Sequence, residues 1–172
     1  VCSSDLGRTE VCESLYGVYP ADSGTIFLEG RRVRPRTPVE ALELGIGHLP
    51  EDRQREGLVL PWEIGKNITL PALSSFTRLG WLDEEKELVF AGDLAQRLNV
   101  KTRSIFTTAE ALSGGNQQKV VVAKVLSRGL KVIVLDEPTK GVDVAAKAAI
   151  SELIGDLAEQ GYGIILVCSA MP

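Results

Sequence analysis

An apolar run that ends in two carboxylates constrains this sequence most. Residues 132–135 read Val-Ile-Val-Leu and are followed directly by Asp136 and Glu137. A strand that is apolar on both faces is typical of the centre of a parallel sheet, and ligands bind at the carboxyl edge of such sheets. The sequence therefore predicts an α/β fold in which these two carboxylates stand at a binding edge.

A second motif lies about twenty residues earlier in the sequence. Residues 112–117 read Leu-Ser-Gly-Gly-Asn-Gln, which predicts a helix with Ser113 as its N-cap. Gly114 and Gly115 let backbone N–H groups approach an anion at the positive end of that helix. Taken singly, each motif is better explained without a nucleotide, the first as an ordinary helix cap and the second as a solvated strand end. Their order, followed by Gly-Val-Asp at 141–143, favours nucleotide hydrolysis.

Hydrophobic periodicity and capping signals predict alternating helices and strands along the rest of the chain. Residues 37–40 form a capping box with proline at the first helical position, and residues 51–57 form a polar loop where a partner could dock. The order of elements predicts a parallel core carrying a helical subdomain between about residues 57 and 127. Helices are expected at about 7–15, 37–44, 63–73, 83–98, 116–127 and 144–160, and strands at 23–29, 46–49, 132–135 and 163–168.

Composition narrows the class of protein. A net charge of −4 leaves no broad cationic surface for a nucleic-acid backbone, so nucleic acid is not the expected partner. The three cysteines (Cys2, Cys12 and Cys168) have no paired metal-ligand spacing, and their odd number argues against a disulfide framework, which favours a reducing cytosol. No apolar run approaches the roughly 20 residues that span a bilayer. Any membrane role must therefore come through a partner.

The start of the chain contains the tail of a phosphate-binding loop. Gly7, Arg8 and Thr9 match the final glycine, the cation and the magnesium-binding hydroxyl of such a loop, although lysine is usual where Arg8 stands. As an isolated triplet they are better explained as a helix start. Cys2 stands where the first glycine belongs, and Asp5 would put a carboxylate against phosphates. We expect residues 1–6 to be a non-native leader, since codons for them resemble the end of a sequencing-library adapter.

These motifs together resemble the ATPases of ABC transporters: residues 112–117 match the signature, Asp136 with Glu137 the Walker B motif, and residues 141–143 the D-loop. The resemblance implies a P-loop NTPase-type parallel sheet core with an inserted helical signature subdomain, truncated here at both ends, so that residues 7–172 are a partial nucleotide-binding domain. It implies ATP and Mg²⁺ as cofactors, with Thr9 and Asp136 on the metal and Glu137 as the catalytic residue. The nucleotide of the chain's own site would be bound by Gly7, Arg8, Thr9, Glu51 and Asp136. The nucleotide of a partner domain would be contacted by Leu112, Ser113, Gly114, Gly115, Asn116 and Gln117, beside the D-loop residues Gly141, Val142 and Asp143.

The Glu-Asp-Arg run at 51–53 and the Asn-Gln-Gln at 116–118 resemble more closely the carboxyl-terminal half of the tandem ATPase subunit of bacterial monosaccharide importers of the ribose, galactose and arabinose types. The resemblance implies a peripheral position on the cytoplasmic face of the inner membrane. It implies three partners: an amino-terminal half in the same subunit, membrane permease subunits and, indirectly, a periplasmic sugar-binding protein.

The sequence departs from a standard ABC site at three positions. Arg8 replaces lysine, Glu51 stands at the glutamine of the Q-loop, and Ser169 stands at the switch histidine. These departures imply that the signature serves an efficient site in the other half, while the chain's own site hydrolyses slowly or mainly binds. The single histidine, His48, is interpreted as a surface or strand-edge residue.

Two other functions stay open, a regulatory nucleotide-binding module and a non-transport ABC ATPase that acts on nucleic acid. The departures from the standard site favour the first, and the retained Glu137 opposes it. The acidic balance opposes the second. The isolated fragment is expected to have little or no activity.

Overall fold

A three-stranded parallel sheet forms the centre of the computed structural model, which describes residues 7–168. Its strands lie in the order β3 (Ile46–Leu49), β6 (Val132–Asp136) and β7 (Gly163–Val167). The apolar run that ends in two carboxylates is therefore the central strand. The expected α/β class with a parallel core is confirmed.

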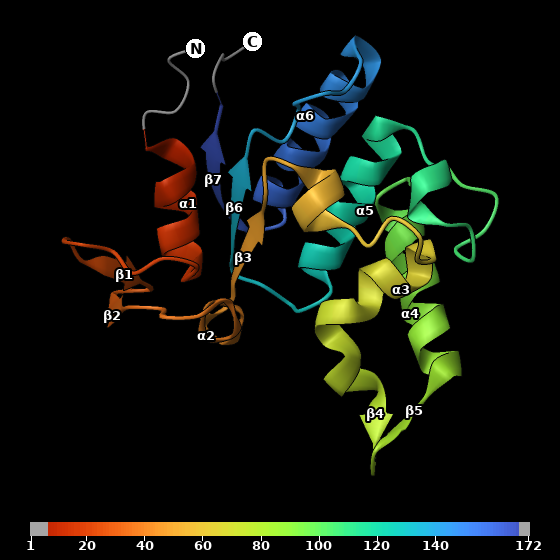
Figure 1. Cartoon of the computed structure of the whole chain (residues 1–172), viewed down its shortest axis with the longest axis horizontal. Coiled ribbons are helices and arrows are strands. Elements are labelled where there is room, and N and C mark those ends of the chain that lie inside the picture. Colours follow the sequence, from red (N-terminus) through yellow and green to blue (C-terminus); the bar gives the residue numbers. More distant parts are fainter. Residues whose placement is uncertain (1–6, 169–172) are drawn as a thin grey trace.

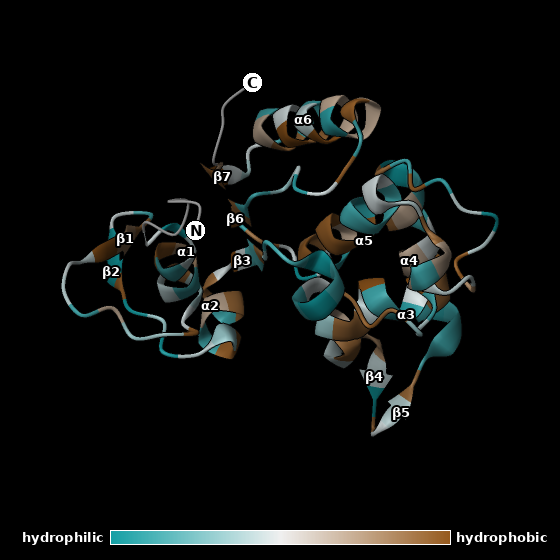
Figure 2. Cartoon of the chain, turned by 45° about the horizontal axis from the view of Figure 1, so that its top comes forward, coloured by the Kyte–Doolittle hydropathy of each residue, from teal (hydrophilic) through white to brown (hydrophobic). Residues whose placement is uncertain are grey.

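Helices cover both faces of this sheet (Figure 1). One face is covered by α1 (Arg8–Tyr16), and the other by α5 (Gly114–Leu126) and α6 (Val144–Glu159). Figure 2 shows apolar as well as polar residues along these helices, and apolar residues of α5 and α6 pack with those of the sheet in one cluster. The helices expected at 7–15, 116–127 and 144–160 are thus present, with ends shifted by at most two residues.

Alternation along the strands gives each face of the sheet its own apolar cluster. Ile133 and Leu135 of β6 are buried in a cluster with residues of α5, whereas Val134 between them packs with Cys12 of α1. Successive side chains of a strand point to opposite faces, which accounts for this division. In the register of β3 with β6, His48 pairs with Val134 and so shares the α1 face.

The helical part of the chain packs on α5. Its main helices are α3 (Ile64–Thr69) and α4 (Glu84–Arg97), and their apolar residues join the same cluster that covers the sheet. One hydrophobic core therefore runs from the sheet through α5 into the helical part. The division of the chain at 57–127 stays a prediction.

Buried polar residues brace the helical part. Asn67, which is fully buried, accepts a hydrogen bond from the Val59 amide at 2.8 Å and donates to the Val59 carbonyl at 3.0 Å. Glu87 is buried with Lys66 at 2.8 Å and the Thr69 hydroxyl at 2.6 Å. A buried carboxylate is stable only when it is paired and hydrogen-bonded in this way. These contacts hold α3 against both α4 and the segment that precedes it.

Three segments differ from the prediction. The loop expected at 51–57 contains a π-helical turn, η1 (Arg53–Gly57), whose first amides are capped by the Asp52 carboxylate. The helix expected at 63–73 ends at Thr69 and continues as the 3₁₀ segment η2 (Leu70–Phe76), because Pro71 has no N–H to donate. The strand expected at 23–29 is shorter and belongs to a separate antiparallel hairpin.

The remaining elements are short and lie outside the central sheet. No helix among residues 7–168 is long and apolar enough to cross a membrane. Helix α2 begins as expected, with the Thr37 hydroxyl accepting from the Glu40 amide at 3.2 Å. These elements are β1 (Ile26–Leu28), β2 (Arg31–Val33), α2 (Pro38–Leu44), β4 (Thr77–Arg78), β5 (Trp81–Leu82) and η3 (Ala109–Ala111).

Candidate functional site

Asp136 ends the central strand and has an unused oxygen. Its side chain is 1% exposed, and the Thr9 hydroxyl from the first turn of α1 donates a hydrogen bond to the carboxylate. The other carboxylate oxygen, Oδ2, is buried and has no hydrogen-bond partner among the described residues. A buried oxygen without a partner is costly, so one is expected to serve a ligand. A carboxylate beside a hydroxyl fits Mg²⁺, which prefers oxygen ligands.

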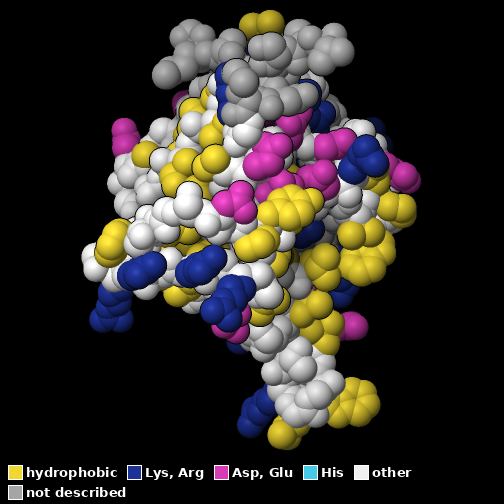
Figure 3. Space-filling model, turned by 60° about the vertical axis from the view of Figure 1, so that its left-hand side comes forward, with side chains coloured by type: hydrophobic (Ala, Val, Ile, Leu, Met, Phe, Trp, Pro, Cys, Tyr) yellow, Lys and Arg dark blue, Asp and Glu magenta, His cyan; other side chains and the backbone are white. Residues whose placement is uncertain are grey.

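Several charged groups surround this carboxylate. Burial raises the pKa of Asp136, and nearby Glu51 and Glu137 raise it further, whereas the hydrogen bond from Thr9 and the charge of Lys140 oppose the rise. Glu51 itself forms an ion pair with Lys140. Figure 3 shows acidic side chains gathered on the upper part of one face, the end toward which the strands of the sheet run. The excess of negative charge favours a cation at this edge.

Glu137 has an unusual backbone conformation. Its φ of 44° lies in the left-handed region, which few residues other than glycine adopt. The conformation is held by hydrogen bonds from the Glu137 amide to the Val167 carbonyl at 2.9 Å and from the Lys140 amide to the Glu137 carbonyl at 2.9 Å. Such outliers cluster at functional sites. The chain therefore turns sharply at the residue expected to be catalytic, directly beyond the strand.

The tail of the phosphate loop begins α1 next to this carboxylate. Gly7 stands at the N-cap with a φ of 71°, which glycine adopts without strain, and Thr9 brings the helix start to Asp136. Arg8 donates from Nη1 to the Cys168 carbonyl at 3.3 Å, so its guanidinium lies near the end of β7. The rest of the loop and Ser169 lie outside the described residues.

The signature motif begins α5, but Ser113 does not cap that helix with its side chain. Its backbone has the extended conformation of an N-cap, yet its hydroxyl accepts from Asn116 Nδ2 at 2.9 Å instead of from a helix amide. Asn116 in turn accepts from the Lys101 amide at 2.7 Å. Ser113 is therefore the N-cap residue as predicted, although its side chain makes no capping hydrogen bond. Ser113 is exposed, so the first turn of α5 stays available to a ligand. Leu112, the residue before Ser113, packs on the main apolar cluster.

The two signature glycines lie against other parts of the chain. A β-carbon on Gly115 would stand 2.6 Å from the Ala146 β-carbon of α6. One on Gly114 would stand 2.7 Å from Arg53 Nη2 and 3.3 Å from the Gly141 carbonyl oxygen. The glycines thus allow the start of α5 to approach the D-loop and α6 closely, which is a packing reason for them besides access to an anion.

Arg53 connects the segment at 51–57 with the D-loop and with the signature, and the sequence did not indicate it as a site residue. Its guanidinium donates to the Lys140 carbonyl at 2.7 Å and to the Gly141 carbonyl at 3.1 Å, beside Gly114. Its neighbour Gln54 donates to Gln117 Oε1 at 3.0 Å. The density of charge at 51–57 suggested a solvated loop. Arg53 contacts Lys140, which lies 87 positions further along the chain, so no local pattern in the sequence could reveal this contact.

The last D-loop residue has a clear local role. Asp143 is the N-cap of α6 and accepts from the Ala146 amide at 2.9 Å. Gly141 before it has a φ of 66° and supplies one of the carbonyls bound by Arg53, and Val142 between them is half-buried. The D-loop therefore runs from the Arg53 contact directly into the start of α6.

His48 lies on the edge strand β3, as predicted, but it is not a surface residue. Its ring packs against Tyr16 with centroids 5.3 Å apart, and its Nε2 is buried without a hydrogen-bond partner within residues 7–168. Burial lowers the pKa of His48 to about 4, so the imidazole is neutral at pH 7. Burial likewise raises the pKa of the neighbouring Cys12 thiol to about 11.

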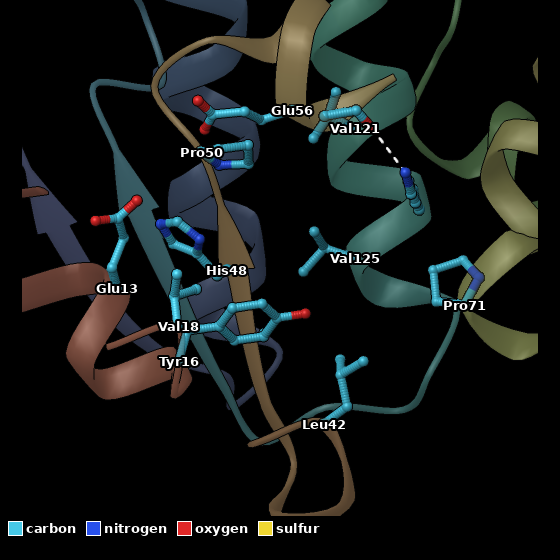
Figure 4. A pocket seen from close by; sticks show the side chains of 13 residues that line it. Glu13, Tyr16, Val18, Leu42, His48, Pro50, Glu56, Pro71, Val121 and Val125 are labelled. Carbon is cyan, nitrogen blue, oxygen red and sulfur yellow. Dashed lines mark hydrogen bonds between the residues drawn. The ribbon is translucent and has the colours of Figure 1, made fainter. Parts of the chain in front are cut away.

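A cavity of about 350 Å³ opens between α1, β3, η1 and α5 (Figure 4). Its wall is mainly apolar, with Glu13, Glu56 and Lys124 as charged groups at its margin. Lys124 donates to the Gly57 carbonyl at 2.8 Å, which ties α5 to the end of η1. The cavity therefore lies where the sheet and the helical part meet. Apolar or aromatic lining comes from Tyr16, Val18, Leu42, Pro50, Pro71, Val121 and Val125.

The sequence matches the family described as ABC transporter over residues 3–140. Ribose import ATP-binding protein RbsA of Bacillus licheniformis is 48% identical over 166 residues, which cover 96% of this chain and 34% of that protein. The protein of the same name from Bacillus subtilis is also 48% identical, with the same shares of 96% and 34% covered. The chain therefore spans about a third of the length of these relatives.

Solved structures agree with the fold. A nucleotide-free ATP-binding cassette from an ABC transporter has a TM-score of 0.78 at 21% identity, covering 92% of this chain and 64% of that one. A dimeric cassette in a post-hydrolysis state, bound to ADP and phosphate, has a TM-score of 0.75 at 20% identity, covering 95% and 70%. The sheet and its helices therefore have the P-loop NTPase architecture expected from the sequence.

Proposed function

The chain belongs to the ABC transporter family, and we propose that it is part of an ATP-binding and ATP-hydrolysing subunit that powers sugar import through a membrane permease. The names of its relatives support a sugar, and ribose is the first one to test. In this proposal the subunit lies on the cytoplasmic face of the bacterial inner membrane. It acts there with an amino-terminal ABC half, permease subunits and, indirectly, a periplasmic sugar-binding protein.

The unpaired Oδ2 of Asp136 carries the proposal of nucleotide hydrolysis. It is buried beside the Thr9 hydroxyl at the carboxyl edge of a parallel sheet, where helix α1 also begins. Asp136 and Thr9 would hold Mg²⁺, whose charge stabilises a transferring phosphoryl group. Gly7 and Arg8 would face the phosphates of the same nucleotide, and the Glu51–Lys140 ion pair borders this edge. Glu137, turned out of the strand by its left-handed backbone, would orient the attacking water.

The signature would serve a nucleotide in the other half of the subunit. Ser113 is exposed, its hydroxyl caps no amide of its own helix, and the glycines after it leave the first turn of α5 uncovered by side chains of their own. A helix start offers fixed N–H dipoles to developing negative charge on a phosphoryl group. Removing one such donor elsewhere costs about 10²- to 10³-fold in rate.

We further propose that the two nucleotide sites of the subunit are unequal. Arg8 is turned toward the Cys168 carbonyl at 3.3 Å, and a planar guanidinium does not replace the ammonium of lysine. Glu51, which stands at the position of the Q-loop glutamine, forms an ion pair with Lys140. The chain's own site would then hydrolyse slowly or mainly bind, while its signature completes the efficient site.

The cavity of Figure 4 is the proposed docking position for a permease segment. It lies beside η1, whose Gln54 contacts Gln117 of the signature helix at 3.0 Å. A segment seated there would touch the sheet, η1 and α5 together. Movement of the signature could therefore be transmitted to the membrane subunit through direct contacts.

Sugar import is tested with the full-length subunit reconstituted with its permease and binding protein in vesicles. Ser113→Arg should lower ATP-driven ribose uptake by at least about 100-fold, because a cation and a bulky side chain then occupy the helix start. Ser151→Arg, on the exposed face of α6, is the matched control and should leave uptake unchanged. Uptake that survives Ser113→Arg contradicts the proposal, as does salt-dependent DNA binding by the intact subunit.

The inequality of the sites is tested by comparing two variants in the same assay. Glu137→Gln removes the carboxylate of the chain's own site and should reduce turnover only partly, whereas Ser113→Arg should abolish it. If Glu137→Gln stops ATP hydrolysis as completely as Ser113→Arg, the two sites are not unequal in the way proposed.

A further inference from the structure

Cys12, His48 and Asp136 meet on one face of the sheet although they are far apart in the sequence. His48 pairs in register with Val134, and Asp136 follows Val134 by two positions, so both side chains point to the face that α1 covers. Helix α1 presents Cys12 to that same face, where it packs with Val134. One potential ligand atom from each of the three residues lies within 4.8 Å of those from the other two.

The three side chains are shielded from solvent to a large extent, and two of them have an unpaired atom that can bind a metal. Cys12 is fully buried, and Asp136 is 1% exposed. Asp136 Oδ2 and His48 Nε2 are both buried and lack a hydrogen-bond partner in the described part of the chain. Packing against Tyr16 holds the His48 ring on this face. A sulfur, an imidazole nitrogen and a carboxylate oxygen are therefore collected at one point, and two of the three side chains each have a buried atom without a hydrogen-bond partner among the described residues.

We propose that Cys12, His48 and Asp136 form a site for a transition-metal ion of the Zn²⁺ class. Tetrahedral Zn²⁺ with one sulfur, one nitrogen and one oxygen ligand separates its donors by roughly 3.3–3.6 Å, so donor atoms that lie within 4.8 Å of one another need to close by about 1.5 Å at most. A water molecule completes the fourth position. Binding replaces the thiol proton, which passes to solvent, with a sulfur–metal bond. Mg²⁺, which takes oxygen ligands, does not use this sulfur and nitrogen.

The site has a route to solvent and a consequence for the nucleotide. His48 lines the cavity of Figure 4, where Glu13 lies on the same side as the imidazole. Because Asp136 belongs both to this site and to the proposed magnesium site, a bound Zn²⁺ competes with Mg·ATP. This competition rests on the proposed function, whereas metal binding by the three residues does not.

Cobalt binding to the purified chain without nucleotide tests the site directly. Co²⁺ is expected to give a thiolate charge-transfer band and the visible bands of tetrahedral coordination, and Zn²⁺ should displace it. Cys12→Ala and His48→Gln should each raise the dissociation constant by more than about 100-fold, since even outer-shell changes cost about 10- to 100-fold. Cys168→Ser, the second described cysteine, is the matched control and should keep the bands. Circular dichroism without metal checks that each variant is folded.

Absence of the thiolate band in the wild-type chain overturns the proposal, as does a band that persists in Cys12→Ala. Should Cys12→Ala fail to fold, the same band in a folded His48→Gln chain at unchanged affinity overturns it equally. Mg·ATP should weaken cobalt binding by occupying Asp136. If the variants behave as expected but Mg·ATP has no effect, the metal site stands and the nucleotide assignment of Asp136 fails.

Discussion

Arg53 is a single side chain that connects η1 with the D-loop and with the start of the signature helix. It extends from η1 to two carbonyls of the D-loop at 2.7 and 3.1 Å and lies against the first glycine of the signature helix. Hydrogen bonds from a charged donor contribute about 1.5–3 kcal/mol each when they are shielded from water. Arg53 is only half-buried, so the lower end of that range applies. Even so, this one residue links the D-loop to the start of the signature helix.

Arg53→Ala should therefore loosen the D-loop. We expect a loss of about 1–2 kcal/mol in the free energy of unfolding and at least about a tenfold fall in ATP turnover of the full-length subunit, since small misplacements of catalytic groups are costly. Urea unfolding and steady-state ATP hydrolysis measure the two effects. Arg55→Ala, two residues away and exposed, is the control and should change neither. Equal effects of the two substitutions would show that Arg53 has no special position.

At the residue scale, the sequence predicted the strand end but not its partners. Asp136 and Glu137 could be located because an apolar run followed by two carboxylates is a local pattern. The contacts of Arg53, and the meeting of Cys12 with His48, could not be located in this way. The residues that meet there lie 36 or more positions apart in the chain, and the meeting of Cys12 with His48 also depends on strand register. Ser113 was correctly predicted as the N-cap, but its hydroxyl accepts from Asn116 Nδ2 at 2.9 Å instead of from a helix amide.

Helices α5 and α6 meet at a point where no side chain fits between them. The first turn of α5 approaches α6 so closely that a β-carbon on Gly115 would overlap the β-carbon of Ala146. The D-loop leads directly into this part of α6 through the Asp143 cap. The packing of two helices therefore fixes the position of the signature relative to the D-loop, and glycine is required by the contact.

Gly115→Ala should displace α5 from α6. Overpacking of this kind typically costs about 1–3 kcal/mol, which outweighs the better helix propensity of alanine. Gly155→Ala, in α6, is the matched control: nothing lies within 4 Å of its added carbon, so it should stabilise the protein by about 0.5–1 kcal/mol. Thermal unfolding of both variants measures the difference. A Gly115→Ala protein as stable as Gly155→Ala would show that the two helices separate freely.

At the scale of elements, local signals predicted the long helices and failed where several influences compete. The capping box predicted α2 correctly, because Thr37 and Pro38 act within one turn. The hairpin of β4 and β5 was missed, since strands of two residues leave no periodicity to read. The turn at η1 was missed because its charged residues suggest a loop, while its stability comes from the Asp52 cap and from Arg53.

The whole molecule is organised around α5, which belongs to both of its parts. One apolar cluster joins Leu135 of the sheet, Val121 of α5 and Ile68 of the helical part. A shift of the helical part therefore also moves the start of α5, where the signature lies. The cavity opens beside that same helix, so an occupant would contact the element through which such a shift passes.

Filling this cavity should separate ATP hydrolysis from transport. Val18 is 43% exposed at the cavity, so Val18→Trp can occupy the space without disturbing the core. We expect the full-length subunit to keep its own ATP hydrolysis within about twofold but to bind the permease at least about tenfold more weakly, because a lost anchor pocket costs 1.4 kcal/mol or more, on the order of tenfold in affinity. Val89→Trp, exposed on α4 away from the cavity, is the control for an added surface tryptophan. Co-purification with the permease and sugar uptake measure the outcome. If Val18→Trp assembles and transports like Val89→Trp, the permease docks elsewhere, and coupling through η1 and α5 must be abandoned with it.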